Sequence, residues 1–238
     1  MRGRIITRVK LTIVAITVLS MFASMLATAE IAEVYSWKAN PGKTTEMMQN
    51  MAQAKAIQEK LGIKVCAYAT SMGTDGFIDY VLRYDSLEAW GEARDAMNSS
   101  AEWNQYWVKA QQNSAGTLLS SITGINMDAS VKAGSFDADQ VYSVFVWQAA
   151  PGRGPELMKV FAEAEKIHES LGARVESYVG GIGAPNQYHY VMSFSNWSEM
   201  AASQAKQMKS AKWAAFTAGI DPTLSTLVSS HSGQKLPL

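Results

Sequence analysis

Side chains able to perform acid–base or ligating chemistry are few in this sequence and lie far apart. The histidines are His168, His189 and His231, and Cys66 is the single cysteine. Zinc sites need ligands at short spacings such as His-X-X-Glu or Cys-X-X-Cys, and neither pattern occurs. No Gly-X-Ser-X-Gly elbow marks a nucleophilic serine. We therefore expect no metal site, and any reaction must use side chains that the fold brings together.

One candidate group lies on two strands at matching positions. Alternation along residues 77–84 puts Asp79 and Arg83 on one face, and residues 187–194 put His189 at the position of Asp79. Together they would supply an acid, a base and an anchor for a bound aromatic substrate. Further candidates for contacts with a small ligand in the same interior are Tyr68, Tyr178 and Glu176. The alternative is that aromatic side chains fill this space, that Asp79 pairs with Arg83 and that His189 has its hydrogen bonds satisfied.

His168 is a separate candidate, because it lies in the middle of an apolar helical stripe. A histidine there is able to ligate haem iron or another metal. The matching position in an earlier helix is Gln58, which favours instead a hydrogen-bonded histidine that packs between elements. His231 lies in the polar C-terminal tail, where we expect it to be solvated. Cys66 lies in a predicted strand as a small buried hydrophobe.

The elements that position these side chains come from an internal repeat. Residues 34 to about 121 recur at 144 to about 231 with a constant offset of 110 and no gap. Matched residues include Trp37 and Trp147, Pro41-Gly42 and Pro151-Gly152, Leu61-Gly62 and Leu171-Gly172, and Trp103 and Trp213. The sequence predicts two copies of one unit, residues 30–125 and 140–238. The linker, residues 126–139, is rich in Asp, Ala, Gly and Ser.

Each copy shows the same order of strands and helices. A strand of aromatic and β-branched residues stops at a Pro-Gly turn, an amphipathic helix follows and ends at a glycine, and a hairpin comes next. A second helix then starts at a capping residue and covers about residues 86–112 and 196–219. The last strands are expected at about 117–123 and 226–230. The order βαββαβ predicts two ferredoxin-like α+β units whose open sheet faces cover each other.

Three segments carry a resemblance to a known superfamily. They are Ala54-Lys55-Ala56-Ile57-Gln58-Glu59-Lys60-Leu61-Gly62, Tyr84-Asp85-Ser86-Leu87-Glu88-Ala89-Trp90 and Ser99-Ser100-Ala101-Glu102-Trp103. In these segments the chain resembles the dimeric α/β-barrel superfamily, in the style of NIPSNAP-like and stress-responsive barrel domains. The resemblance implies that the two copies form, within one chain, a barrel that other members form from two chains. The motifs concern packing and capping, so they indicate a fold and no particular reaction.

The resemblance also bears on cofactors. Haem-handling members of the superfamily commonly use a histidine on the second helix, and neither second helix here contains one. This departure argues against haem-degrading monooxygenase activity. We expect no cofactor, and haem ligated by His168 or His189 is the alternative.

The N-terminus has the three-part order of a secretory signal peptide. Basic residues from Arg2 to Lys10 precede an uncharged run, residues 11–26, and Ala27-Thr28-Ala29 forms a cleavage site. We expect cleavage after Ala29 and export to the periplasm or the medium, with no membrane span left. A retained membrane anchor over residues 11–29 is the alternative.

Composition and charge narrow the class of function. The chain is 47% hydrophobic and 18% charged, with 21 basic and 21 acidic residues. All charged residues of the signal segment are basic. The mature protein is therefore acidic and unsuited to binding the phosphates of nucleic acids. We expect a barrel that binds a small apolar or aromatic ligand between its sheets. The alternatives are a cofactor-light or haem-dependent monooxygenase-like enzyme and a structural module that forms homo-oligomers.

Overall fold

The computed structural model describes residues 28–238 apart from residue 75, and it contains two copies of one α+β unit. The first copy consists of β1 (Ile31–Ala39), α2 (Thr44–Lys60), β2 (Lys64–Met72), β3 (Ile78–Tyr84), α3 (Leu87–Ser99), α4 (Ala101–Gln112) and β4 (Gly116–Asn126). The second consists of β5 (Val141–Ala149), α5 (Gly154–Ser170), β6 (Arg174–Gly180), β7 (Gln187–Phe194), α6 (Trp197–Met208), α7 (Ala211–Ala218) and β8 (Ser225–Lys235). A short 3-10 helix, η1 (Ala133–Phe136), lies between the copies. The predicted signal peptide lies outside the described residues except for its last two positions.

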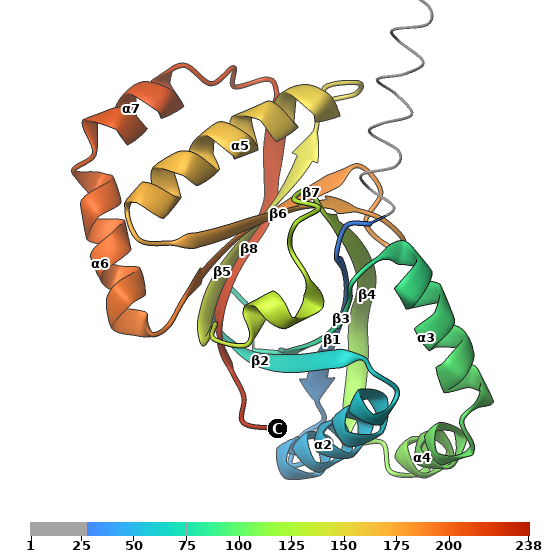
Figure 1. The fold of residues 1–238 in the computed structure, drawn as a ribbon. Coiled ribbons are helices and arrows are strands. Elements are labelled where there is room, and N and C mark those ends of the chain that lie inside the picture. Colours follow the sequence, from blue (N-terminus) through green and yellow to red (C-terminus); the bar gives the residue numbers. More distant parts are fainter. Residues whose placement is uncertain (1–27, 75) are drawn as a thin grey trace, which may run out of the picture.

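The eight strands form one closed barrel in the order β1-β3-β2-β8-β5-β7-β6-β4. Each copy supplies four neighbouring strands in the ferredoxin-like order, β4-β1-β3-β2 and β8-β5-β7-β6. Two antiparallel seams join the copies, because β2 pairs with β8 and β4 pairs with β6. The predicted fold, two ferredoxin-like units that form a barrel within one chain, is confirmed (Figure 1).

Helices cover the outer face of the sheet in each copy: α2, α3 and α4 over the first, and α5, α6 and α7 over the second (Figure 1). In the first copy, Met47 and Met51 of α2 share one buried cluster with Ile78 and Leu82 of β3. This contact follows from the two periods, because a helical stripe of every third or fourth residue faces alternate residues of a strand. Within the described part of the chain, no helix is long and apolar enough to cross a membrane.

The first helix of each copy ends at the predicted glycine. Gly62 and Gly172 have φ angles of +82° and +105°, in the left-handed region that disfavours a side chain. Their amides donate to the carbonyls of Glu59 and Glu169, which closes the last turn of each helix.

The second helix of each copy is two helices where the hydrophobic pattern predicts one. Ser100 and Ser210 adopt extended backbone conformations, and their side chains accept hydrogen bonds from the amides of Trp103 and Trp213. Each serine therefore breaks the helix and caps the one that follows.

The last strands are longer than predicted. The C-terminal end of β4, Gly124–Asn126, pairs with β6, and the end of β8 from Ser232 pairs with β2. Glycine and polar residues are poor strand formers, so this pairing between copies has no local signal in the sequence.

The expectation of a repeat without gaps is also wrong. Trp37 pairs with Leu118 and Trp147 with Leu227, an offset of 109 in the last strand.

Candidate functional site

Asp79 faces the barrel interior, as predicted, but its partners differ from those expected. Its carboxylate accepts hydrogen bonds from Ser36 Oγ at 2.6 Å and the Tyr142 hydroxyl at 2.7 Å. His231 Nε2 lies 3.1 Å from the same carboxylate. The expectation that His231 is solvated is wrong, because β8 extends past this residue and carries it alongside Asp79. Asp79 is therefore fully engaged by neighbouring side chains.

Arg83 does not pair with Asp79, so that expectation is also wrong. Arg83 Nη1 donates to Glu30 Oε1 at 2.8 Å and to the Tyr178 hydroxyl at 2.9 Å, and its guanidinium lies 3.6 Å from the ring centroid of Phe136. Four residues along a strand separate two side chains by about 13 Å. Asp79 and Arg83 therefore share a face of β3 but lie at different levels of the barrel.

His189 is largely buried, and its Nε2 atom has no hydrogen-bond partner among the described residues. Burial, followed by the charge of His231, lowers the pKa of His189 to about 4. The imidazole is therefore neutral at pH 7. Within residues 28–238, no hydrogen bond joins His189 to Asp79 or Arg83, so these three are not brought together as an acid, a base and an anchor.

The three other interior candidates, Tyr68, Tyr178 and Glu176, are buried against protein side chains. The rings of Tyr68 and Tyr142 meet edge to face with centroids 5.0 Å apart, and Glu176 accepts a hydrogen bond from Arg174 at 2.7 Å. The apolar cluster inside the barrel contains Ala32, Tyr68, Val81, Tyr142, Val144, Val146 and Tyr178. This packing favours the alternative in which aromatic side chains occupy the barrel.

His168 is buried between α5 and the sheet, with both ring nitrogens engaged. Nδ1 lies 2.7 Å from the Tyr190 hydroxyl and Nε2 lies 3.0 Å from Gln207 Nε2, and burial lowers the pKa of the imidazole. The equivalent Gln58 accepts a hydrogen bond from the Tyr80 hydroxyl at 2.6 Å. The two positions therefore have the same packing role. In the described ranges, 28–74 and 76–238, no three His, Cys, Asp or Glu side chains are placed to hold a metal ion.

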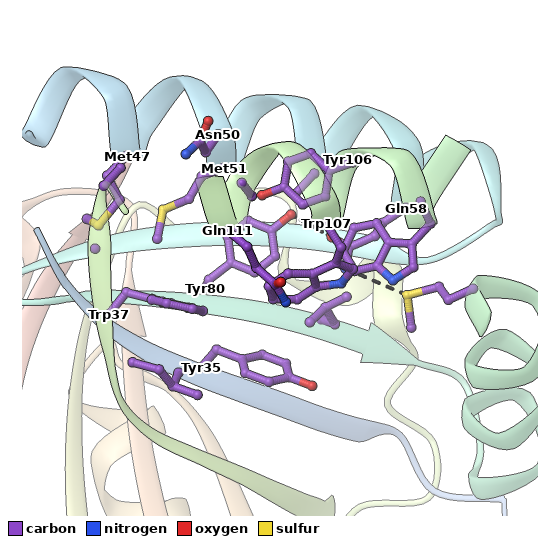
Figure 2. Close-up of a pocket in the computed structure, with 18 of the residues that line it drawn as sticks. Tyr35, Trp37, Met47, Asn50, Met51, Gln58, Tyr80, Tyr106, Trp107 and Gln111 are labelled. Atoms are coloured by element: carbon purple, nitrogen blue, oxygen red, sulfur yellow. Dashed lines mark hydrogen bonds between the residues drawn. The ribbon is translucent and has the colours of Figure 1, made fainter. Parts of the chain in front are cut away.

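The first copy contains a cavity of about 500 Å³ between the outer face of its sheet and helices α2 and α4 (Figure 2). Nine of the 22 lining residues are aromatic or contain sulfur: Tyr35, Trp37, Tyr80, Trp103, Tyr106, Trp107, Met47, Met51 and Met97. Amides are contributed by Asn50, Gln58, Asn98 and Gln111. A cavity of this size and character is typical of sites for small organic molecules.

Strand alternation and helical spacing together produce this lining. Alternation along β1 turns Tyr35 and Trp37 toward the helices (Figure 2). On α4, Tyr106 and Trp107 follow Trp103 by three and four residues, which puts both next to it on the helix surface, and the rings of Trp103 and Tyr106 stack with centroids 5.2 Å apart. No residue of α4 is fully buried. Its large rings therefore cover a space that they do not fill.

One edge of the cavity is polar. Glu33 is buried and accepts hydrogen bonds from the hydroxyls of Tyr35 at 2.9 Å and Tyr84 at 3.0 Å. Arg94 Nη1 lies 3.2 Å from Glu33 Oε1 and 3.1 Å from the Tyr35 hydroxyl oxygen. Burial and the neighbouring Glu33 raise the pKa of Tyr35 to about 12 and that of Tyr84 higher still, so both hydroxyls keep their protons and donate to Glu33. We call these four residues the Glu33 cluster.

The second copy lacks the Glu33 cluster. At an offset of 110, the positions of Glu33, Tyr35, Tyr84 and Arg94 hold Ser143, Phe145, Phe194 and Gln204. Neither an ion pair nor a phenol is available there. Residue types and spacing alone do not single out these four residues, although the aligned copies differ at every one of them. The difference between the copies can be interpreted only once the structure shows that β1, β3 and α3 bring the four side chains together.

Comparison with solved structures finds proteins that share this fold over most of the chain, and one that aligns with part of it. A protein of Fusobacterium nucleatum named a "putative monooxygenase" matches with a TM-score of 0.57 and 12% identity, over 88% of this chain and 93% of its own. A variant of chlorite dismutase from Candidatus Nitrospira defluvii matches with a TM-score of 0.52 and 8% identity, over 90% of this chain and 94% of its own. A NIPSNAP family protein of unknown function from Agrobacterium tumefaciens aligns with a TM-score of 0.35 and 23% identity, over 42% of this chain and 90% of its own.

Structural matches at identities this low show the fold alone. Function has to be argued from the geometry of the site. No protein-family model and no curated protein matches the sequence.

Proposed function

We propose that this chain, which has the dimeric α/β-barrel fold within a single polypeptide, binds a small aromatic molecule in the cavity of its first copy. The observation that carries the proposal is the space of about 500 Å³ lined by six aromatic side chains beside the Glu33 cluster. A mostly apolar pocket with a few placed polar groups is the usual form of a small-molecule site. We place the ligand outside the barrel and not between the sheets, because Tyr68, Tyr142 and Tyr178 pack together inside it.

The lining favours a flat ligand. Tryptophan and tyrosine rings stack on or meet the edge of another aromatic ring, which contributes about 0.5–1.5 kcal/mol beyond the burial of area. The flexible thioethers of Met47 and Met51 extend from α2, across the cavity from Tyr35 and Trp37 of β1 (Figure 2). They adapt to ligands of different shape.

Haem is the cofactor that the superfamily resemblance suggests. Among the described residues, the cavity lining contains neither histidine nor cysteine, the commonest axial ligands of haem iron. Both ring nitrogens of His168 are engaged. His189 Nε2 has no partner in the described part of the chain, but it lies on the interior face of the barrel, where Tyr68, Tyr142 and Tyr178 pack together. These residues do not fit haem, and the proposed binding function does not depend on it.

Filling the cavity tests the proposal. Ala110 of α4 lines the cavity, whereas Val108 of the same helix is 59% exposed. We expect Ala110→Phe to abolish binding of naphthalene in equilibrium dialysis and Val108→Phe to leave it unchanged. Saturable binding that survives in Ala110→Phe would contradict the proposed site.

A second candidate is an enzyme of the monooxygenase kind that acts on an aromatic substrate in the same cavity. The Glu33 cluster favours it, because Glu33 lines the cavity and a carboxylate is able to accept a proton from a substrate. Oxygen uptake with 2-naphthol, measured at an electrode, separates the two candidates. Uptake that is lost in Glu33→Gln supports the enzyme, and absence of uptake leaves a binding protein.

The proposal extends to export of the chain, which rests on the N-terminal pattern of residues 1–29. Cleavage after Ala29 would leave every described strand and helix intact, because β1 begins at Ile31. N-terminal sequencing of the protein from the envelope or medium of its host tests this. A first residue of Glu30 is expected, and an intact Met1 would show a retained segment.

A further inference from the structure

We propose that the Glu33 cluster makes the cavity selective for uncharged aromatic compounds that carry a hydrogen-bond acceptor. In this proposal Arg94 contacts the acceptor, and Glu33 sets the charge preference. The inference rests on the proposed function, because it concerns the ligand of the same cavity.

Arg94 has donors to spare at the cavity edge. Its side chain lines the cavity and is 43% exposed. The hydrogen bonds to Glu33 and Tyr35 both use Nη1. A guanidinium carries five N–H donors, so those on Nε and Nη2 remain for a ligand. An oxygen at the rim of a stacked ring is a suitable acceptor for them.

The charge of Arg94 is already balanced. Glu33 and Arg94 are the charged residues among the described cavity lining, and their side chains form an ion pair at 3.2 Å. A ligand carboxylate would add a negative charge that has no partner in a partly desolvated space, which is costly. A carbonyl or ether oxygen accepts the same hydrogen bond without that cost.

The two tyrosines keep Glu33 in place. Each hydroxyl donates to a different carboxylate oxygen, Tyr35 to Oε1 and Tyr84 to Oε2, so the carboxylate is held from both sides. The Glu33 side chain is only 7% exposed. It therefore acts as a positioning residue that holds and neutralises Arg94. Because the second copy has none of the four residues, the selective site occurs once per chain.

Three probes with one ring system test the inference: naphthalene, 2-acetylnaphthalene and 2-naphthoate. Their dissociation constants are measured by equilibrium dialysis at pH 7. For the unmodified protein we expect 2-acetylnaphthalene to bind about tenfold more tightly than naphthalene, as one hydrogen bond to a charged donor would give. We expect 2-naphthoate to bind more weakly than 2-acetylnaphthalene.

Two variants separate selection from a merely structural role. Arg94→Met should remove the preference, so that 2-acetylnaphthalene and naphthalene bind this variant equally tightly. Glu33→Gln leaves the charge of Arg94 unbalanced, so 2-naphthoate should become the tightest of the three. Gln204→Met, at the equivalent and exposed position of the second copy, is the matched control and should change nothing. Arg94 is partly exposed, so Arg94→Met remains decisive even when Glu33→Gln fails to fold.

The outcomes distinguish this inference from the proposed function. Equal binding of all three probes, or an equal loss of all three in Glu33→Gln, would overturn the selectivity while the cavity remains a binding site. Binding of none of the probes would overturn both.

Discussion

The two histidines of the barrel differ in the partners that surround them. His231 lies 3.1 Å from the carboxylate of Asp79, whereas His189 Nε2 is enclosed without a partner among the described residues. A buried imidazole without an acceptor resists protonation, because the charged form loses its hydration. His189 is therefore a source of acid sensitivity and not a proton donor at neutral pH.

The lowered pKa of His189 predicts a pH dependence of stability. Its folded pKa of about 4 is below the usual value of 6.5, so the unfolded chain binds more protons between these values. The contribution of the neutral histidine is present above pH 6.5 and is lost as the pH falls toward 4. Between pH 7 and 5 we expect the free energy of unfolding to fall by about 1–2 kcal/mol more than in His189→Gln.

Urea unfolding of both proteins at the two pH values measures this difference. The comparison cancels the titration of the carboxylates, which both proteins share. Identical pH dependence in the two proteins would contradict the prediction, because it would mean that His189 has the same pKa in the folded and the unfolded protein.

Among the elements, α4 is distinctive because it borders the cavity without a fully buried residue. Its N-terminus is held by Ser100, whose side chain accepts a hydrogen bond from the Trp103 amide at 3.2 Å. Ser210 caps α7 in the same way, with the Trp213 amide at 3.1 Å. The two caps form a matched pair, one beside the cavity and one in the other copy.

We predict that Ser100→Ala destabilises α4 by about 1 kcal/mol through loss of the cap. Hydrogen exchange over residues 101–112 should become faster, and naphthalene binding weaker. Ser210→Ala should speed exchange in α7 only and leave binding as it is. Equal loss of binding in both variants would contradict this prediction, because it would show that naphthalene binding does not depend on the stability of α4 in particular.

The sequence predicts elements best where one local period determines them. The stripe of Met47, Met51 and Ala54 and the stop at Gly62 fix α2, and the order of such elements fixes the fold. The sequence does not predict the break at Ser100, because serine is also common within helices. It does not predict the ends of β4 and β8, because the strands that they pair with lie in the other copy. The cavity escapes because an aromatic stripe looks the same whether the space beside it is filled or empty.

At the scale of the whole molecule, stability depends on the two seams between the copies. Gly233 lies at the seam of β2 and β8, where an added Cβ would lie 2.6 Å from Tyr142 Cε1 and 2.7 Å from the Ala69 carbonyl oxygen. No side chain fits there without a shift of the strands. The same residue position therefore links the copies and limits the packing inside the barrel.

We predict that Gly233→Ala destabilises the protein by about 1–3 kcal/mol, the usual effect of overpacking. Gly91 of α3 is the control, because an added Cβ would meet no atom within 4 Å. Gly91→Ala should be neutral or raise the free energy of unfolding by up to about 1 kcal/mol. Urea unfolding of the two variants provides the measurement, and a neutral Gly233→Ala would show that the seam adapts.

The β2–β8 seam also dictates when the barrel is completed. Tyr68 pairs with Lys235, so a strand near the start of the first copy waits for residues near the C-terminus. Contacts so distant in the chain form slowly. On a ribosome, the first copy emerges with the edge of β2 unpaired, and this edge stays unpaired until β8 has been synthesised. For the exported chain that we propose, this delay is an advantage, because a translocon threads polypeptides that have not yet folded.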